Sequence, residues 1–205
     1  MTKVSRTTVI RNAHPRLRLD RRAVARVIHI LDEHFPASAL VRGRSPEASA
    51  KADGATRQPK AWRRLKRRGV LAVPPGELSI AFLTDPALAK IHADFMHDPS
   101  ATDVITFAGD ATAGLAGEIC VSADMAARHV GLVEGPAPAG PRPSRSSALP
   151  SAFSAELTLY IVHGWLHLAG YDDLQPARKR RMRAAENRAM TLLRKAKAVP
   201  TFQLR

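Results

Sequence analysis

The chain of 205 residues has one cysteine, few aromatic residues and no long apolar segment. Cys120 alone cannot close an internal disulfide or build a cysteine-based zinc cluster. We therefore expect a cytoplasmic location and no disulfide-linked partner. No stretch approaches the roughly 18 apolar residues of a transmembrane helix, and segment 1–22 lacks the apolar core of a secretory signal. We expect no membrane association.

Acidic residues are also scarce, because 18 Asp and Glu stand against 32 Lys and Arg, for a net charge of +14. Such an excess attracts nucleic-acid phosphates whatever the base sequence. An arginine-rich codon usage would give the same charge to any protein. The cations cluster at 63–68 and 178–183. Because only 5% of residues are aromatic, phosphate contacts are favoured over base stacking.

One run of residues, 163–173, reads His-Gly-Trp-Leu-His-Leu-Ala-Gly-Tyr-Asp-Asp. His163 and His167 are four residues apart, so both imidazoles project from one face of a helix. Gly170 can take the left-handed conformation that ends a helix, which brings Asp173 back toward the histidines. Two imidazoles and a carboxylate, with one position open, are the ligand set of a catalytic zinc site, although manganese or iron also suits them. We predict that His163, His167 and Asp173 bind one ion, Zn²⁺ or another divalent metal.

Two other interpretations of this run remain open. In a chain with eight histidines, two can stand four residues apart by chance. The spacing is also similar to the metzincin peptidase pattern His-Glu-x-x-His-x-x-Gly-x-x-His, with Asp173 at the third histidine. Gly164 stands where that pattern has its general-base glutamate, so a peptidase would need a carboxylate from elsewhere, such as Glu118.

The same run resembles the signature His-Gly-x-Leu-His-Leu-x-Gly-Tyr-Asp-His of the YbeY-type rRNA maturation factors, and departs from it at Asp173. Segments 102–107 and 117–122 resemble the family's Thr-Asp-Val-Leu-Ser-Phe and Gly-Asp-Ile-x-Ile-Ser strands. The resemblance implies a zinc-dependent, single-strand-specific endoribonuclease of rRNA maturation (16S rRNA 3′ end processing) and ribosome quality control. Its expected partners are rRNA and ribosomal subunits, with the metal polarising a water or a phosphoryl oxygen.

Site residues beyond the metal ligands are less clearly marked. A spacing of three residues puts Arg178 and Arg181 on a shared helix face, and we expect both to contact RNA. The family's arginine before the strand at 102–107 is replaced by the segment Phe-Met-His at 95–97. The catalytic side chain is therefore unassigned, with His97 and Glu118 as candidates. The missing arginine leaves an alternative function, a ribosome-assembly factor that binds RNA without cleaving it.

The order of elements predicts an α+β fold, a small mixed β-sheet packed with helices. We expect strands at 9–10, 78–82, 103–107 and 118–122, and helices from residue 20 to 31, from 85, from 124 and over 175–196. A buried central helix over 153–168 carries the metal-binding motif. We expect one domain over 1–205, with disordered insertions at 42–58, rich in small and charged residues, and at 134–150, rich in proline.

Overall fold

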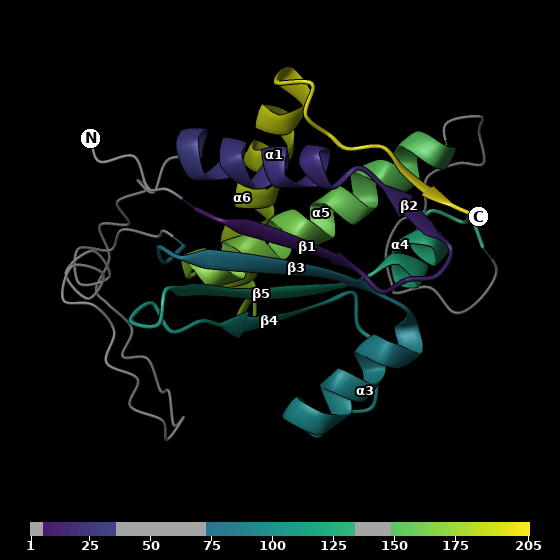
Figure 1. The fold of residues 1–205 in the computed structure, drawn as a ribbon, viewed down its shortest axis with the longest axis horizontal. Coiled ribbons are helices and arrows are strands. Elements are labelled where there is room, and N and C mark those ends of the chain that lie inside the picture. Colours follow the sequence, from purple (N-terminus) through teal and green to yellow (C-terminus); the bar gives the residue numbers. More distant parts are fainter. Residues whose placement is uncertain (1–5, 36–72, 134–148) are drawn as a thin grey trace.

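The computed structural model describes residues 6–35, 73–133 and 149–205 (Figure 1). These residues form an α+β fold, as predicted. The strands are β1 (Thr8–Asn12), β2 (Leu17–Leu19), β3 (Glu77–Leu83), β4 (Val104–Ala108), β5 (Leu115–Ser122) and β6 (Phe202–Leu204). The helices are α1 (Arg21–His34), α3 (Asp85–Met96), α4 (Ala123–His129), α5 (Leu149–Ala169) and α6 (Pro176–Lys195).

The predicted insertions lie largely outside the described residues. Segment 42–58 falls wholly outside them, as do 134–148 and the basic cluster at 63–68. Residues 149 and 150, assigned to the second insertion, instead begin α5, four residues before the predicted start. Proline is compatible with the first turn of a helix, because no intrahelical partner is available there for the N–H that it lacks.

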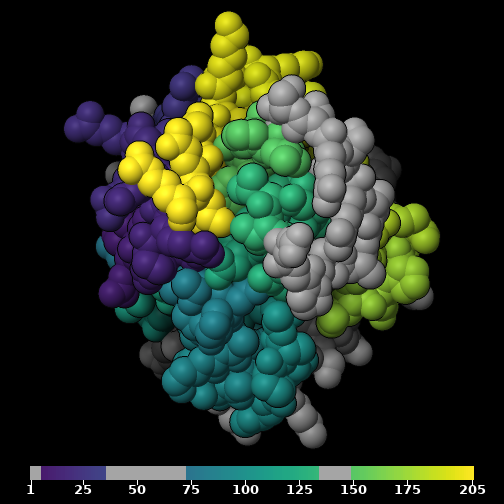
Figure 2. Space-filling model, turned by 90° about the vertical axis from the view of Figure 1, so that its right-hand side faces the viewer, coloured from purple at the N-terminus to yellow at the C-terminus, as the bar shows by residue number. Residues whose placement is uncertain are grey.

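The main sheet has four strands in the order β1-β3-β5-β4. β1 pairs with β3 and β3 with β5 in parallel, whereas β4 runs antiparallel to β5 and forms one edge. This is the mixed sheet that was predicted. The short strands β2 and β6 form a second, antiparallel sheet that was not predicted. Three residues give no readable periodicity, so this pairing near the two ends of the described chain, visible in Figure 2, follows from tertiary structure alone.

α5 is the central helix and packs across one face of the sheet (Figure 1). Its buried residues surround it on all sides, as predicted for a helix at the centre of the core. The closest approach is at Gly164, where an added Cβ would lie 2.5 Å from Cγ2 of Ile119 and 3.1 Å from Cγ2 of Thr106. Glycine is required here because β4 and β5 come so near the helix axis.

The other face of the sheet carries a smaller apolar cluster. Because side chains alternate along a strand, Glu118 and Cys120 flank Ile119 and point away from α5. α3 covers part of this face through Leu88, which is buried, and Ile91, which packs against the cluster. α3 then ends at His97 with a positive φ of 58°, and Phe95 in its last turn is 67% exposed.

α6 follows the loop after α5 and returns along it. Its apolar residues face the core, Met182 among them. Its cations face outward. No helix in the described part of the chain has the length and apolarity needed to cross a membrane.

Candidate metal centre

The two histidines lie near the C-terminal end of α5, and the helix ends so that the chain reverses beside them. Gly170 has a φ of 102°, as predicted for a residue that terminates the helix. The Gly170 N–H donates to the carbonyl of His167 and the Tyr171 N–H to that of Leu166, at 2.9 and 3.0 Å. These two bonds form a Schellman motif, which turns the following loop back over the last turn of the helix.

This reversal brings the three predicted ligands together. The Nε2 atoms of His163 and His167 are 2.9 Å apart. The Asp173 carboxylate lies 4.0 Å from His163 Nε2 and 3.8 Å from His167 Nε2. Within residues 6–35, 73–133 and 149–205, this is the only group of three or more His, Cys, Asp or Glu side chains whose potential ligand atoms lie that close.

The other nitrogen of each imidazole has a partner of its own. His163 Nδ1 lies 2.6 Å from Oε1 of Glu186 on α6, and His167 Nδ1 lies 3.2 Å from the carbonyl oxygen of Tyr171. Each Nδ1–H donates to its oxygen, which leaves the Nε2 lone pairs directed at one another. Two lone pairs at 2.9 Å repel unless a proton or a metal ion lies between them, and with Asp173 beside them the donor set fits a divalent metal ion.

The surroundings shift the pKa values of the two histidines in opposite directions. Burial by itself lowers the pKa of His163, but the hydrogen bond and charge of Glu186, with further help from Asp103 and Asp173, raise it overall. Burial also lowers the pKa of His167, and the neighbouring His163 lowers it further. His167 is therefore the more readily neutral imidazole of the pair, and a neutral imidazole is the form that binds metal.

The adjacent carboxylates Asp172 and Asp173 have different roles in the structure. Asp172 accepts a hydrogen bond from the Leu174 N–H at 2.9 Å and forms an ion pair with Arg178. The hydrogen bond from the Leu174 N–H has the largest effect and lowers the pKa of Asp172, and the hydrogen bond from Arg178 lowers it further. Asp172 therefore fixes the loop, whereas the Asp173 carboxylate faces the histidines.

The remaining predicted residues are spread over the molecule. Arg178 is half-buried in its ion pair with Asp172, whereas Arg181 is exposed on α6. His97 is exposed at the end of α3, and no hydrogen bond or ion pair among the described residues joins it to the two histidines. Glu118 lies on the face of the sheet opposite α5, where its Oε1 accepts a 3.4 Å hydrogen bond from Ser79 Oγ.

The place of a metzincin general base is filled by packing. Because an added Cβ at Gly164 already meets Ile119, a glutamate side chain there would displace the sheet from the helix. Glu118, the proposed substitute, is on the wrong face of the sheet to serve the same centre. The structure therefore provides neither of the carboxylates that the peptidase interpretation needs.

A functional residue that the sequence did not single out is Glu186. It is the one carboxylate among the eight cations of α6. That isolation was the available signal, because a lone acid on a strongly basic helix has a specific partner more often than a solvating role. Its partner, His163, is 23 residues away and could not be identified without the tertiary structure.

A polar stripe continues along α5 from the centre. Glu156 lies two turns before His163 on the same side of the helix, with its Oε1 3.7 Å from Nε2 of His129. Burial raises the pKa of Glu156, and nearby His129 counteracts part of that rise. Tyr160 lies between Glu156 and His163 along the helix. The candidate metal centre is therefore at one end of this polar stripe, on a helix that is otherwise apolar.

Fold and site together define an α+β protein with a candidate metal centre at the end of its central helix. The sequence model of the family described as Endoribonuclease YbeY matches residues 57–134 and 143–194, more than half of the chain. The chain belongs to the Endoribonuclease YbeY family. The predicted family is therefore confirmed, and with it the assignment to a family of enzymes.

Two relatives that are more than 30% identical agree with this assignment. The Endoribonuclease YbeY of Chlamydia pneumoniae is 35% identical over 136 residues, which cover 64% of this chain and 78% of that protein. The Endoribonuclease YbeY of Geobacter sulfurreducens is 31% identical over 150 residues, 67% of this chain and 89% of that protein. A solution structure of a Thermotoga maritima protein aligns with 94% of this chain and 93% of its own at 14% identity, with a TM-score of 0.44.

Proposed function

We propose that this protein is a metal-dependent endoribonuclease that cleaves single-stranded RNA. The observation that carries the proposal is the arrangement of His163, His167 and Asp173 around one point, in a member of a family named for endoribonuclease activity. We further propose rRNA as the substrate, maturation of the 16S rRNA 3′ end and ribosome quality control as the processes, ribosomal subunits as partners and the cytoplasm as the location.

The proposed ligands and their partners have distinct tasks. His163, His167 and Asp173 hold the ion, for which we propose Zn²⁺, since nitrogen and carboxylate ligands with one open position suit it. A bound ion would supply a Lewis acid that polarises a water or a phosphoryl oxygen. Glu186 and the Tyr171 carbonyl fix the tautomer and orientation of the imidazoles through their Nδ1 atoms. Arg178 holds Asp172, and through it the loop that presents Asp173.

The charge distribution supports RNA as the ligand. The loop between α5 and α6, residues 170–175, is called the metal loop because it contains Asp173. α6 leads away from this loop and carries exposed cations, among them Arg181 and Arg183. A strand of RNA whose phosphates lie along this helix would reach the metal centre at its start. We also propose that residues 1–205 form a single domain. The family match leaves 135–142 unmatched, which supports an insertion in that part of the sequence.

The test is cleavage of a single-stranded rRNA fragment by the full chain, before and after treatment with a chelator and after addition of Zn²⁺ or Mn²⁺. We expect activity to disappear with the chelator and to return with the ion. His163→Ala and His167→Ala should lose metal and activity together. His34→Ala, which removes an exposed histidine of α1, is the matched control and should keep both.

One outcome would favour the second candidate function. The segment at 95–97 has no arginine, and its Phe95 and Met96 are exposed to solvent. A protein that binds metal and rRNA but cleaves no RNA with any ion added would be a non-cleaving assembly factor instead.

A further inference from the structure

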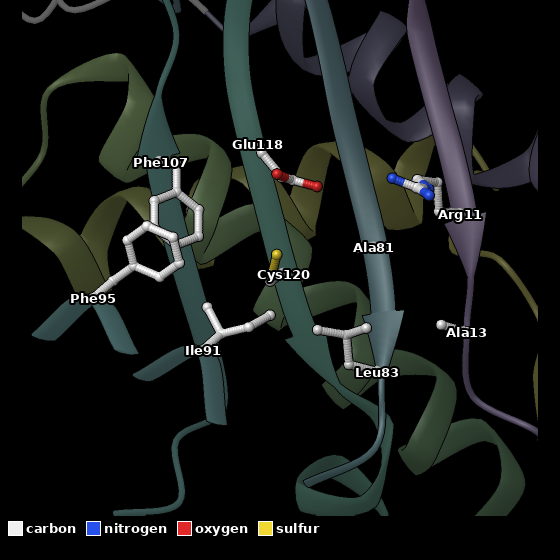
Figure 3. A pocket seen from close by; sticks show the side chains of 9 residues that line it. All are labelled: Arg11, Ala13, Ala81, Leu83, Ile91, Phe95, Phe107, Glu118 and Cys120. Carbon is white, nitrogen blue, oxygen red and sulfur yellow. The ribbon is translucent and has the colours of Figure 1, made fainter. Parts of the chain in front are cut away.

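A cavity lies on the face of the sheet opposite the candidate metal centre (Figure 3). Its volume is about 410 Å³, within the range of about 300–1,000 Å³ that is usual for pockets that bind small molecules. The bottom of the cavity is formed by Ala81 on β3 and Cys120 on β5, which are partners in the sheet register. Because both side chains are small, they leave space above the sheet. α3 covers only one end of this face, so the space above the two small residues stays open.

One wall of the cavity is aromatic. Phe107 on β4 and Phe95 on α3 form an edge-to-face pair with ring centroids 5.1 Å apart, and both border the cavity. Phe95 is 67% exposed, although the chain has only six phenylalanines. An exposed aromatic ring at the rim of a cavity is available to stack on a ligand that enters it.

The cavity also has two charged residues. Arg11 on β1 and Glu118 on β5, which is the register partner of Phe107, stand on either side of β3, and in Figure 3 their side chains extend toward one another above it. Among the residues that the structure describes, the Glu118 carboxylate accepts a long hydrogen bond of 3.4 Å, from Ser79 Oγ. An acceptor of two hydrogen bonds and a fork of donors are therefore presented to the same space.

These walls select a flat ring with polar edges. An aliphatic chain would fill the apolar part but cover the half-buried Glu118 carboxylate without offering it a donor, which is costly. An acidic peptide would meet the charge of Glu118. A nucleobase offers a face to stack on Phe95 and an edge of N–H donors and oxygen or nitrogen acceptors. Among the bases, guanine presents two adjacent N–H groups, N1–H and N2–H, to a carboxylate, and the acceptors O6 and N7 to an arginine.

We propose that this cavity binds an unpaired guanine of an RNA strand, stacked on Phe95 with its N–H edge on Glu118 and its O6 on Arg11. The inference rests on the proposed function, because that function supplies RNA as the partner. It adds a base-specific subsite to a surface that otherwise binds RNA through charge.

The position of the cavity relative to the metal centre fits this role. β4 is an edge strand, and its successive side chains serve the two faces. Thr106 faces Gly164 of the central helix, whereas Phe107 is part of the aromatic wall. A single strand that passes around this edge would place its guanine in the cavity and a neighbouring phosphodiester on the side of the metal centre. Guanine would then determine where the strand is held.

The test measures nucleotide binding directly. The full chain, freed of metal by a chelator, is titrated with GMP, IMP, AMP, CMP and UMP and followed by NMR chemical shifts. We expect GMP to bind best. IMP lacks the 2-amino group and so one hydrogen bond to the carboxylate, which should weaken binding roughly tenfold or more.

Variants then assign the contacts. Phe95→Ala should weaken GMP binding roughly fivefold or more through the loss of stacking. Glu118→Gln should remove the preference for GMP over AMP, and Glu118→Asp should retain part of it. The matched controls are Asp94→Asn, which removes an exposed carboxylate of the same helix α3, and Leu115→Ala, which removes an exposed apolar side chain outside the cavity. Both should bind GMP as the unaltered protein does.

The outcomes separate this inference from the proposed function. Equal binding of all five nucleotides, or GMP binding unchanged in both Phe95→Ala and Glu118→Gln, would overturn the guanine subsite. A protein that cleaves RNA in a metal-dependent reaction but binds no GMP would retain the proposed function and lose the subsite. A protein that binds GMP through Phe95 and Glu118 but never cleaves RNA would do the reverse.

Discussion

Neighbouring or similar residues have different roles here because of the atoms that surround them. Asp172 and Asp173 are adjacent, yet one carboxylate is held by Arg178 and a backbone N–H while the other faces two imidazoles. Glu186 sits on a basic helix and bonds to a histidine of the preceding helix. Chemical type alone therefore does not assign a carboxylate to the metal centre. The atoms that the carboxylate faces do.

Glu186→Ala should weaken metal binding about 10- to 100-fold, the usual effect of losing an outer partner of a metal-binding histidine. The reason is that His163 loses the acceptor that fixes its Nδ1–H tautomer. Affinity is measured by competition with a chromogenic chelator. Glu186→Gln, which keeps an acceptor but not the charge, should fall between the two. Asn187→Ala, a change at the next position, is the control, and an equal loss there would remove the specific role of Glu186.

Substitutions of the two aspartates should separate their roles. Asp173→Ala should lose much of the metal, and Asp173→His, which restores the residue in the family's signature, should keep it. Asp172→Ala should retain metal more fully, since its carboxylate bonds to Leu174 and Arg178 instead. Metal per chain is measured by elemental analysis of the dialysed proteins. Loss of metal from Asp172→Ala with full retention in Asp173→Ala would exchange the two assignments.

At the scale of elements, the contact between α5 and the sheet determines the site. Gly164, which follows His163 directly, lets the helix approach β5 closely. α6 then packs on α5 and delivers Glu186. The metal centre is therefore assembled from two packed helices and the loop that joins them.

Gly164→Ala should destabilise the protein. The added methyl group would lie 2.5 Å from Ile119 Cγ2, and overpacking of this kind costs about 1–3 kcal/mol. Replacing a helical glycine by alanine gains at most about 1 kcal/mol, so the packing cost outweighs it. The measurement is the free energy of unfolding in urea. The double variant with Ile119→Ala should be less destabilised than the sum of the two single changes, and strict additivity would show that the two side chains do not clash.

Over the whole molecule, charge and layering act together. The net charge of +14 gives a general attraction for nucleic-acid phosphates. Most of the described cations lie at the surface, whereas the side chain of Arg6 is only 5% exposed. The second sheet, β2 with β6, ties the N-terminal part of the described chain to its end, and Phe202 of β6 packs on Phe82 of β3 with ring centroids 5.6 Å apart. The surface proposed to bind RNA thus lies on one connected core.

Arg181→Ala should weaken binding of single-stranded rRNA and flatten its salt dependence by about 0.7 in the slope of log K against log salt, the value for one phosphate contact. Arg181 is exposed, so folding and metal content should not change. Arg178→Ala should act differently, because it frees Asp172 and loosens the metal loop. Binding is followed by fluorescence anisotropy over a range of salt concentrations. Lys90→Ala, on the exposed side of α3, is the control, and an identical slope for Arg181→Ala and the unaltered protein would place the RNA elsewhere.

Local patterns in the sequence determined much of this structure. The spacing of His163, His167 and Gly170 encodes a helix that ends in a left-handed turn, because each step depends only on residues within two turns. The N-cap of α1 at Asp20, whose side chain accepts from the Arg22 N–H, follows in the same way. The α+β class and the main strands were readable from alternation and from turn residues.

Tertiary structure alone decided which distant groups meet. Glu186 on α6 contacts His163 on α5. Glu118 lines the cavity on the face of the sheet opposite α5, together with Phe95 and Arg11. The three-residue strands β2 and β6 pair although they are far apart in the sequence. The partner in each of these contacts could not be identified from neighbouring residues, because it depends on how the helices and strands pack. Hydrogen bonding within a helix is a short-range property that sequence spacing expresses directly. Packing is long-range, and it determined which residues surround the candidate metal centre and where the cavity lies on the opposite face of the sheet.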